Sequence, residues 1–229
     1  MNRRITGISS MATRGLLTDL AADYTRLSGV PVVMEAVGGV DAAKRVQAGE
    51  AFDLVVLASD VIARLTAAGQ VVAGSAVDLV HSGVSVAVRA GAPQPDIGSE
   101  AGLRQALLAA SSIGYSTGPS GVALLKLFER WGLAEAIRPK SVQAPPGVPV
   151  GSLVADGRVA LGFQQLSELI HQAGITVIGP LPDAVQIITT FSAGVCSTCD
   201  HPDAARALLA FLASPAASAA KLRHGMLPA

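Results

Sequence analysis

Short apolar runs rich in Val and Ile alternate along the chain with segments whose apolar residues recur at helical spacing. In the first half, strands are predicted at Arg4–Ile8, at Val30–Val37 and in the continuous apolar run Asp53–Ala58. Each is followed by a helical segment, and Gly29 and Gly49 stand where the first two helices should end. These helices are expected at residues 12–27, 41–48 and 60–68. Such alternation is typical of parallel α/β units.

A second series of strands and helices begins after residue 82. Its strands are predicted at 83–90, 112–115, 159–163, 176–178 and 187–195, and its helices at 100–110, 121–131, 148–155, 166–170, 202–213 and 216–224. In the last third of the chain, a strand and two helices are expected to return to the first lobe. This indicates two lobes, the second inserted into the first. We place lobe 1 at residues 1–82 and 188–229 and lobe 2 at residues 83–187, and we expect a ligand cleft between the lobes.

The composition narrows the possible partners. Of 229 residues, 50% are apolar and 15% are charged, and 17 Lys and Arg balance 17 Asp and Glu. This balance removes the basic surface that a nucleic-acid binder needs to neutralise phosphates. No uninterrupted apolar stretch approaches the roughly 18 residues of a membrane span. We therefore expect a globular protein with a small-molecule partner, no nucleic-acid partner and no membrane insertion.

The two ends of the chain carry signals for location and redox chemistry. Met1–Arg4 is basic like the start of a signal peptide, but Ile5–Met11 is predicted as a short strand, without a long apolar segment or cleavage site behind it. This pattern predicts a cytoplasmic protein, or a periplasmic one if a leader has been removed. Cys196 and Cys199 form a CxxC without a second ligand pair, so we expect two free thiols near a strand end.

Ligands of α/β sheets gather where strand ends meet helix N-termini, because free backbone N–H groups and the positive end of the helix dipole converge there. Five such junctions, at residues 9–14, 37–41, 58–60, 115–121 and 146–151, are rich in Gly, Ser or Thr. One such residue also serves as an ordinary helix cap, but the five together favour an anion site. The candidate binding residues here are Ser9, Ser10, Met11, Arg14, Gly38, Gly39, Ser59, Ser116, Thr117, Ser120 and Val148.

Other side chains extend or limit this chemistry. The guanidinium of Arg14 stands one turn into the first helix, where it can reach a bound carboxylate or simply face solvent. Gln164 and Gln165 follow the strand 159–163, and alternation directs only one of them toward the cleft; both are kept as binding candidates. The four His residues show no helical pairing, so no metal site is expected. Neither a nucleotide-binding loop nor a GxSxG motif occurs, and no cofactor is expected.

Several strings resemble the molybdate-binding receptors of ABC transporters. They are Ile8-Ser9-Ser10-Met11 before a helix, residues 47–60, Pro119-Ser120-Gly121 at a helix start, residues 157–163 and the closing helix before residues 214–216. The resemblance covers nearly the whole chain. It implies an α/β, two-lobed type 2 periplasmic-binding-protein-like fold with mixed sheets flanked by helices, and it places Ser10, Ser120 and Val148 at binding positions. For an exported protein it also implies an ABC permease as partner.

The departures from that family argue against molybdate. The receptors hold the oxyanion with a serine where this chain has Gly38-Gly39 and with a tyrosine where it has Gln165, and their Asp-Pro start of the fourth junction is Ser116-Thr117 here. Two lost hydroxyl contacts would leave a buried oxyanion unpaired, which is costly. The strings at residues 162–169, 178–182 and 191–194 resemble more closely a branch of this fold that includes aconitate isomerase, which interconverts cis- and trans-aconitate.

These observations favour an isomerase that moves a proton between two carbons of a small polycarboxylate. Such chemistry needs a base and fixed donors for the carboxylates, for which Ser10, Arg14, Thr117 and Ser120 are suited. The candidate bases are Glu35, Asp41, Asp60 and Tyr115. Burial at the end of an apolar strand would raise the pKa of Glu35, although the same position at an edge would face solvent. The alternatives are an ABC-transporter solute-binding protein for an oxyanion or carboxylate and, third, a cytoplasmic ligand sensor.

Overall fold

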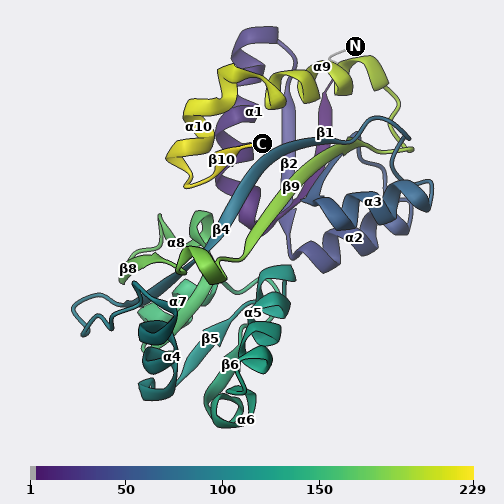
Figure 1. The fold of residues 1–229 in the computed structure, drawn as a ribbon. Coiled ribbons are helices and arrows are strands. Elements are labelled where there is room, and N and C mark those ends of the chain that lie inside the picture. The colour runs from purple at the N-terminus through teal and green to yellow at the C-terminus, as the bar shows by residue number, and fades with distance from the viewer. Residues whose placement is uncertain (1–3) are drawn as a thin grey trace. The chain divides into compact units, whose positions relative to one another are not determined.

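The computed structural model describes residues 4–229, so the first three residues of the basic start Met1–Arg4 lie outside the described part (Figure 1). The chain divides into two compact units, unit 1 up to Ser82 and from Thr190 to Ala229, and unit 2 from Gly83 to Thr189. Two strands, β4 (Val77–Arg89) and β9 (Ile188–Val195), carry residues of both units. Over residues 4–229, no helix combines the length and the apolar character that crossing a membrane requires.

Unit 1 is built on a mixed sheet with the strand order β2-β1-β3-β9-β4 and with β10 paired to β4. Strand β1 runs parallel to β2 and β3, whereas β9 is antiparallel to β3. Besides β4 and β9, the elements of unit 1 are β1 (Ile5–Ser10), η1 (Met11–Thr13), α1 (Arg14–Ser28), β2 (Val32–Val37), α2 (Gly39–Gln47), β3 (Leu54–Ala58), α3 (Ser59–Ala67), α9 (Pro202–Ala213), η4 (Pro215–Ala217), α10 (Ser218–Arg223) and β10 (Leu227–Pro228).

The central strand β3 of unit 1 has a continuous apolar sequence because both of its faces are covered. Leu54 and Val56 belong to the core formed with α1 and α9, whereas Val55 and Leu57 belong to the core formed with α2 and α3. Figure 1 shows these two sets of helices on opposite faces of the sheet. Because helices cover both faces, every residue of β3 is buried.

Unit 2 has the strand order β4-β7-β5-β6, with β8 also paired to β4. Strand β5 is parallel to β6 and β7, and β4 is antiparallel to β7 and β8. Besides the shared strands, the elements of unit 2 are α4 (Glu100–Ala109), β5 (Ile113–Tyr115), α5 (Pro119–Arg130), α6 (Ala134–Ile137), η2 (Arg138–Lys140), β6 (Ser141–Gln143), α7 (Val150–Ala155), β7 (Leu161–Gln165), α8 (Leu166–Leu169), β8 (Ile175–Pro180) and η3 (Asp183–Val185).

Helix α7 packs unusually close to the sheet of unit 2. A Cβ built on Gly162 would lie 2.5 Å from Cγ2 of Val154, and one built on Gly114 would lie 2.7 Å from Cγ1 of Val159. Real side chains do not approach so closely, so glycine at both positions lets the helix and the residues after it rest against β5 and β7. The first turn of α7 lies beside the carboxyl end of β7, where the N–H of Gly151 donates to Gln164 Oε1 at 3.2 Å.

Candidate functional site

The carboxyl ends of three parallel strands form one edge of unit 1. Ser10 at the end of β1 pairs in register with Val37 at the end of β2, and α2 begins directly afterwards at Gly39. A Cβ built on Gly39 would lie 3.6 Å from the Cβ of Ser10. The structure therefore brings together the candidates Ser10, Gly38 and Gly39.

The hydroxyl of Ser10 is buried and has no hydrogen-bond partner among residues 4–229. Its neighbours are satisfied within the protein, since Ser9 Oγ donates to the carbonyls of Ser10 and Glu35 at 3.3 and 3.4 Å, and Thr13 Oγ1 donates to the Ser10 carbonyl at 3.1 Å. Leaving a buried hydroxyl unpaired costs about 1–3 kcal/mol. An anion that accepted this hydrogen bond would remove that cost.

Arg14 places an unpaired cation four residues after Ser10. It is the first residue of α1, following the short turn that starts at Met11, and its side chain is exposed. Within the described chain its guanidinium forms no ion pair or hydrogen bond. Ser59, the first residue of α3, is half-buried at the end of β3. This edge therefore offers hydroxyls and a free guanidinium, the donors that suit a carboxylate.

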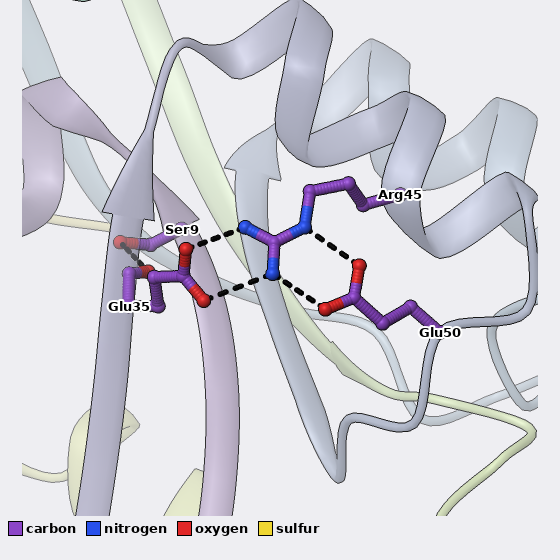
Figure 2. Close-up of polar contacts among 4 residues, drawn as sticks. All are labelled: Ser9, Glu35, Arg45 and Glu50. Carbon is purple, nitrogen blue, oxygen red and sulfur yellow. Dashed lines mark hydrogen bonds and ion pairs between the residues drawn. The ribbon is translucent and has the colours of Figure 1, made fainter.

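Glu35 does not have the buried environment that would raise its pKa. Strand β2 lies at the edge of the sheet, and the side chain of Glu35 is exposed. Figure 2 shows Arg45 between two carboxylates, with Nη1 and Nη2 at 2.5 and 3.0 Å from Glu35 and Nε at 2.6 Å from Glu50. These hydrogen bonds from Arg45 lower the pKa of Glu35. A carboxylate held in this way is a weak base, so of the two alternatives for Glu35 the structure supports the edge position that faces solvent and not the buried one with a raised pKa.

Two other predicted bases of unit 1 also lie at the surface. Asp60 is exposed and pairs with Arg64 one turn later in α3, with 2.7 Å between Oδ2 and Nη1. Asp41 is an exposed residue in the first turn of α2. A carboxylate at a helix N-terminus is stabilised by the helix dipole, so Asp41 has an ordinary structural role there.

Unit 2 has a second polar edge at the carboxyl ends of its parallel strands. Tyr115 at the end of β5 pairs in register with Gln143 of β6 and Phe163 of β7. In the loop that follows, the hydroxyls of Ser116 and Ser120 lie 3.3 Å apart, and Thr117 is half-buried. Tyr115 itself is partly buried against the core of unit 2. The candidates of the fourth junction are thus neighbours at one strand end.

The remaining candidates of unit 2 are engaged within the protein. The backbone N–H of Val148 donates to the Pro145 carbonyl at 3.0 Å. Gln165 Nε2 donates to Thr189 Oγ1 at 2.8 Å, while Gln164 Oε1 accepts from the N–H of Gly151 in α7 at 3.2 Å. Both glutamine side chains are buried, each with its own partners. Alternation along β7 separates them, as expected for neighbouring strand residues.

Glu168 is a titratable residue of this edge that the sequence pattern did not single out. It lies in the short helix α8, directly after β7, and its Oε1 accepts from Gln164 Nε2 at 2.8 Å. Although the residue as a whole is only partly buried, protein atoms surround its carboxyl group, and this desolvation raises its pKa to about 7. Perturbed carboxyl groups of this kind occur preferentially at functional sites. The signal available in the sequence was the string at residues 162–169, which includes Glu168 and resembles the aconitate isomerase branch.

Metal and thiol chemistry find little support in the described residues. Across residues 4–229, no group of three or more His, Cys, Asp or Glu side chains could hold a metal ion. Cys196 and Cys199 are free thiols, as predicted. Burial raises the pKa of Cys196 to about 12 and that of Cys199 to about 11, so both stay protonated and unreactive near neutral pH.

Known proteins resemble this chain in sequence and in fold. An aconitate isomerase from a Pseudomonas species is 39% identical over 230 residues, covering 98% of this chain and 87% of that protein. The Azotobacter vinelandii periplasmic molybdate-binding protein superposes with a TM-score of 0.81 at 20% identity, covering 97% of this chain and 98% of that chain. The sulfate-binding protein SubI from Mycobacterium tuberculosis H37Rv gives a TM-score of 0.80 at 18% identity, with coverages of 99% and 87%.

These structural likenesses establish a two-lobed periplasmic-binding-protein fold, with the mixed sheets and flanking helices that the sequence predicted. The sequence profile of the bacterial extracellular solute-binding proteins matches residues 5–227, which is nearly the whole described chain. The chain belongs to the bacterial extracellular solute-binding protein family.

Proposed function

We propose that this protein is an aconitate isomerase, which interconverts cis- and trans-aconitate by moving one proton between two carbons. The observation that carries the proposal is the 39% identity to the Pseudomonas aconitate isomerase over 98% of the chain. At this identity and coverage, the relative supports a shared reaction far better than the structural neighbours, which are below 25% identical and support the fold alone.

The edge of unit 1 supports the binding of a carboxylate. Ser10 has a buried hydroxyl without a partner, and Arg14 has a guanidinium without one among the described residues. Both groups would donate to carboxylate oxygens, and charge-assisted bonds of this kind are stronger than neutral ones. During the reaction, fixed donors also stabilise the negative charge that spreads onto a carboxylate beside the carbanion. No step of this reaction requires a metal or an organic cofactor.

The proposal is tested by incubating the protein with trans-aconitate in deuterated water and following the proton NMR spectrum. We expect cis-aconitate to form. The reaction should reach the same equilibrium mixture of the two isomers whether it starts from trans- or from cis-aconitate. Absence of both isomer formation and deuterium exchange would contradict an isomerase. Heat-denatured protein serves as the control for uncatalysed exchange.

The alternative is a solute-binding protein of the molybdate-receptor type, which the family membership favours. Gly38, Gly39 and Gln165 stand where the molybdate receptors, by resemblance, carry hydroxyl contacts. We therefore expect calorimetry to detect aconitate binding and negligible molybdate or sulfate binding. Tight molybdate binding without isomerisation would favour the receptor function and an ABC permease as partner. The cytoplasmic location stays a prediction, which cell fractionation would test.

A further inference from the structure

The carboxyl group of Glu168 is held from one side only. Its Oε1 accepts a hydrogen bond from Gln164 Nε2 at 2.8 Å, and Gln164 Oε1 in turn accepts from the N–H of Gly151 at 3.2 Å. The buried glutamine thus bridges the first turn of α7 to α8 and fixes the position of the carboxyl group. Its other oxygen, Oε2, has no hydrogen-bond partner within residues 4–229. This oxygen is available to accept or release a proton.

The described elements of unit 2 that pack against Glu168 contain no positive charge that would lower its pKa. Strands β7 and β8 pack against α8, and neither they nor α7 contain a charged residue. The ionisable residue nearest along the chain is His171. Desolvation therefore dominates and raises the pKa of Glu168 to about 7, where a carboxyl group can exchange a proton in both directions at neutral pH.

A second feature of α8 is a buried hydroxyl that could donate to a ligand. The Oγ of Ser167, the residue before Glu168, is buried and has no hydrogen-bond partner in the part of the chain that the structure describes. Both residues follow the carboxyl end of β7, which pairs in register with the Tyr115 end of β5. This edge already contains Ser116 and Ser120, so Glu168 stands at a strand end where ligands of α/β proteins gather.

We infer that Glu168 is the residue that removes and returns the proton in the isomerisation, with Gln164 as its positioning residue. The inference rests on the proposed function. The Glu168 carboxylate takes a proton from the methylene carbon of trans-aconitate, and the electron pair of that C–H bond forms a new double bond to the central carbon. The electrons of the old double bond then take the proton back from Glu168 at the former vinyl carbon. Atoms and charge balance, and no oxidant or co-reactant is consumed.

The test compares the wild-type protein with Glu168→Gln, Glu168→Asp and, as a matched control, Glu129→Gln on the exposed side of α5. For Glu168→Gln we expect kcat to fall by about 100-fold or more, while KM and the calorimetric aconitate affinity change by less than about threefold. Glu168→Asp should keep part of the activity, and Glu129→Gln should match the wild type. In the wild type, kcat/KM should fall below an apparent pKa of about 7, and this acidic limb should be absent from the residual activity of Glu168→Gln.

A single residue that removes and returns the proton also predicts internal return. In deuterated water, the first product formed by the wild type should contain less than one deuterium per molecule. A kcat of Glu168→Gln within about threefold of the wild type would overturn the inference, as would a parallel loss of aconitate affinity. Should Glu168→Gln fail to fold, Glu168→Asp decides, because a kcat equal to that of the wild type would overturn the inference. A wild type that neither isomerises nor exchanges would instead contradict the proposed function itself.

Discussion

At the residue scale, two hydroxyls near the end of β1 differ in their partners. The buried Oγ of Ser10 has none among the described residues, whereas Thr13 Oγ1 donates to the Ser10 carbonyl at 3.1 Å. A hydroxyl without a hydrogen bond inside the protein can donate one to a ligand, but it does not stabilise the fold. A hydroxyl that is hydrogen-bonded inside the protein stabilises the fold and has no hydrogen bond left to donate to a ligand.

Replacing Ser10 with Ala should therefore weaken aconitate binding without loss of stability. We expect the calorimetric affinity to fall about 10- to 100-fold, as for a lost hydrogen bond to a charged ligand, and the free energy of unfolding to stay equal or rise by up to about 1 kcal/mol. Thr13→Val is the matched control, which should lose about 1 kcal/mol of stability and keep its affinity. Unchanged affinity of Ser10→Ala would remove Ser10 from the site.

Glu168 gives a second prediction, on the pH dependence of stability. Its pKa is raised from 4.5 to about 7 on folding, so the folded protein binds its proton more tightly than the unfolded chain does. The penalty for burying the charge is absent below pH 4.5, grows as pH rises to about 7 and is constant above, where linkage puts it at about 3 kcal/mol. Glu168→Gln carries no charge to bury. Denaturant unfolding should therefore show that its free energy of unfolding rises relative to that of the wild type between pH 4.5 and about 7. A stability difference independent of pH would contradict the shift.

The sequence identified residue types of the site better than their environments. The serines and glycines at strand ends could be selected because helix starts and turns restrict which residues occur there. The environments of Glu35 and Glu168 could not be predicted from the sequence, since they depend on which residues pack around them in the folded protein. Glu35 lies on an edge strand beside Arg45, which comes from another element, and Glu168 is desolvated where its short helix α8 packs against β7 and β8.

At the element scale, the loop after β5 depends on one glycine. A Cβ built on Gly121 would lie 1.9 Å from the carbonyl oxygen of Ser116, whereas the nearest atom to a Cβ on Gly118 would be Ser116 Oγ at 3.8 Å. Gly118 also has a φ of −77°, which any residue adopts. The start of α5 can therefore approach the Ser116 backbone only because residue 121 has no side chain.

Gly121→Ala should force the loop away from α5, and Gly118→Ala should leave it in place. We expect Gly121→Ala to lower the free energy of unfolding by about 1–3 kcal/mol, the usual cost of overpacking, and to change the amide chemical shifts of residues 115–118. Gly118→Ala should stay within about 0.5 kcal/mol of the wild type. Equal stability of the two variants would show that the backbone relaxes around the new methyl group.

Elements with strong periodicity were predictable, and those specified by pairing were not. The buried run of β3 and the helix ending at Gly29, which adopts a left-handed φ of 72°, follow from local sequence. The three-residue strand β6 has no apolar run, and its pairing with β5 defines it.

Strand β4 begins at Val77, earlier than expected, because its polar residues have partners on β9. Asp78 accepts from Ser192 Oγ at 2.5 Å, and His81 Nδ1 lies 2.9 Å from Thr190 Oγ1.

At the scale of the whole molecule, two continuous strands connect the compact units. The change from unit 1 to unit 2 falls inside β4, between Ser82 and Gly83, and the return falls inside β9, between Thr189 and Thr190. The sequence predicted passages near these positions, although no linker composition marks them. When one core unfolds, the half of each shared strand that lies in the other core loses the ordered chain that continues it. The stabilities of the two units should therefore be coupled.

Trp131, the single tryptophan of the chain, makes this coupling measurable. It lies in unit 2, with its ring 6.5 Å from that of Phe128 and the Arg104 guanidinium 5.7 Å from its centre. Its fluorescence reports on unit 2, whereas far-UV circular dichroism reports on the helices of both units. We expect both signals to give the same urea midpoint, and Leu16→Ala in the core of unit 1 to lower both midpoints together. A fluorescence midpoint that this substitution leaves unchanged would show that the units unfold independently.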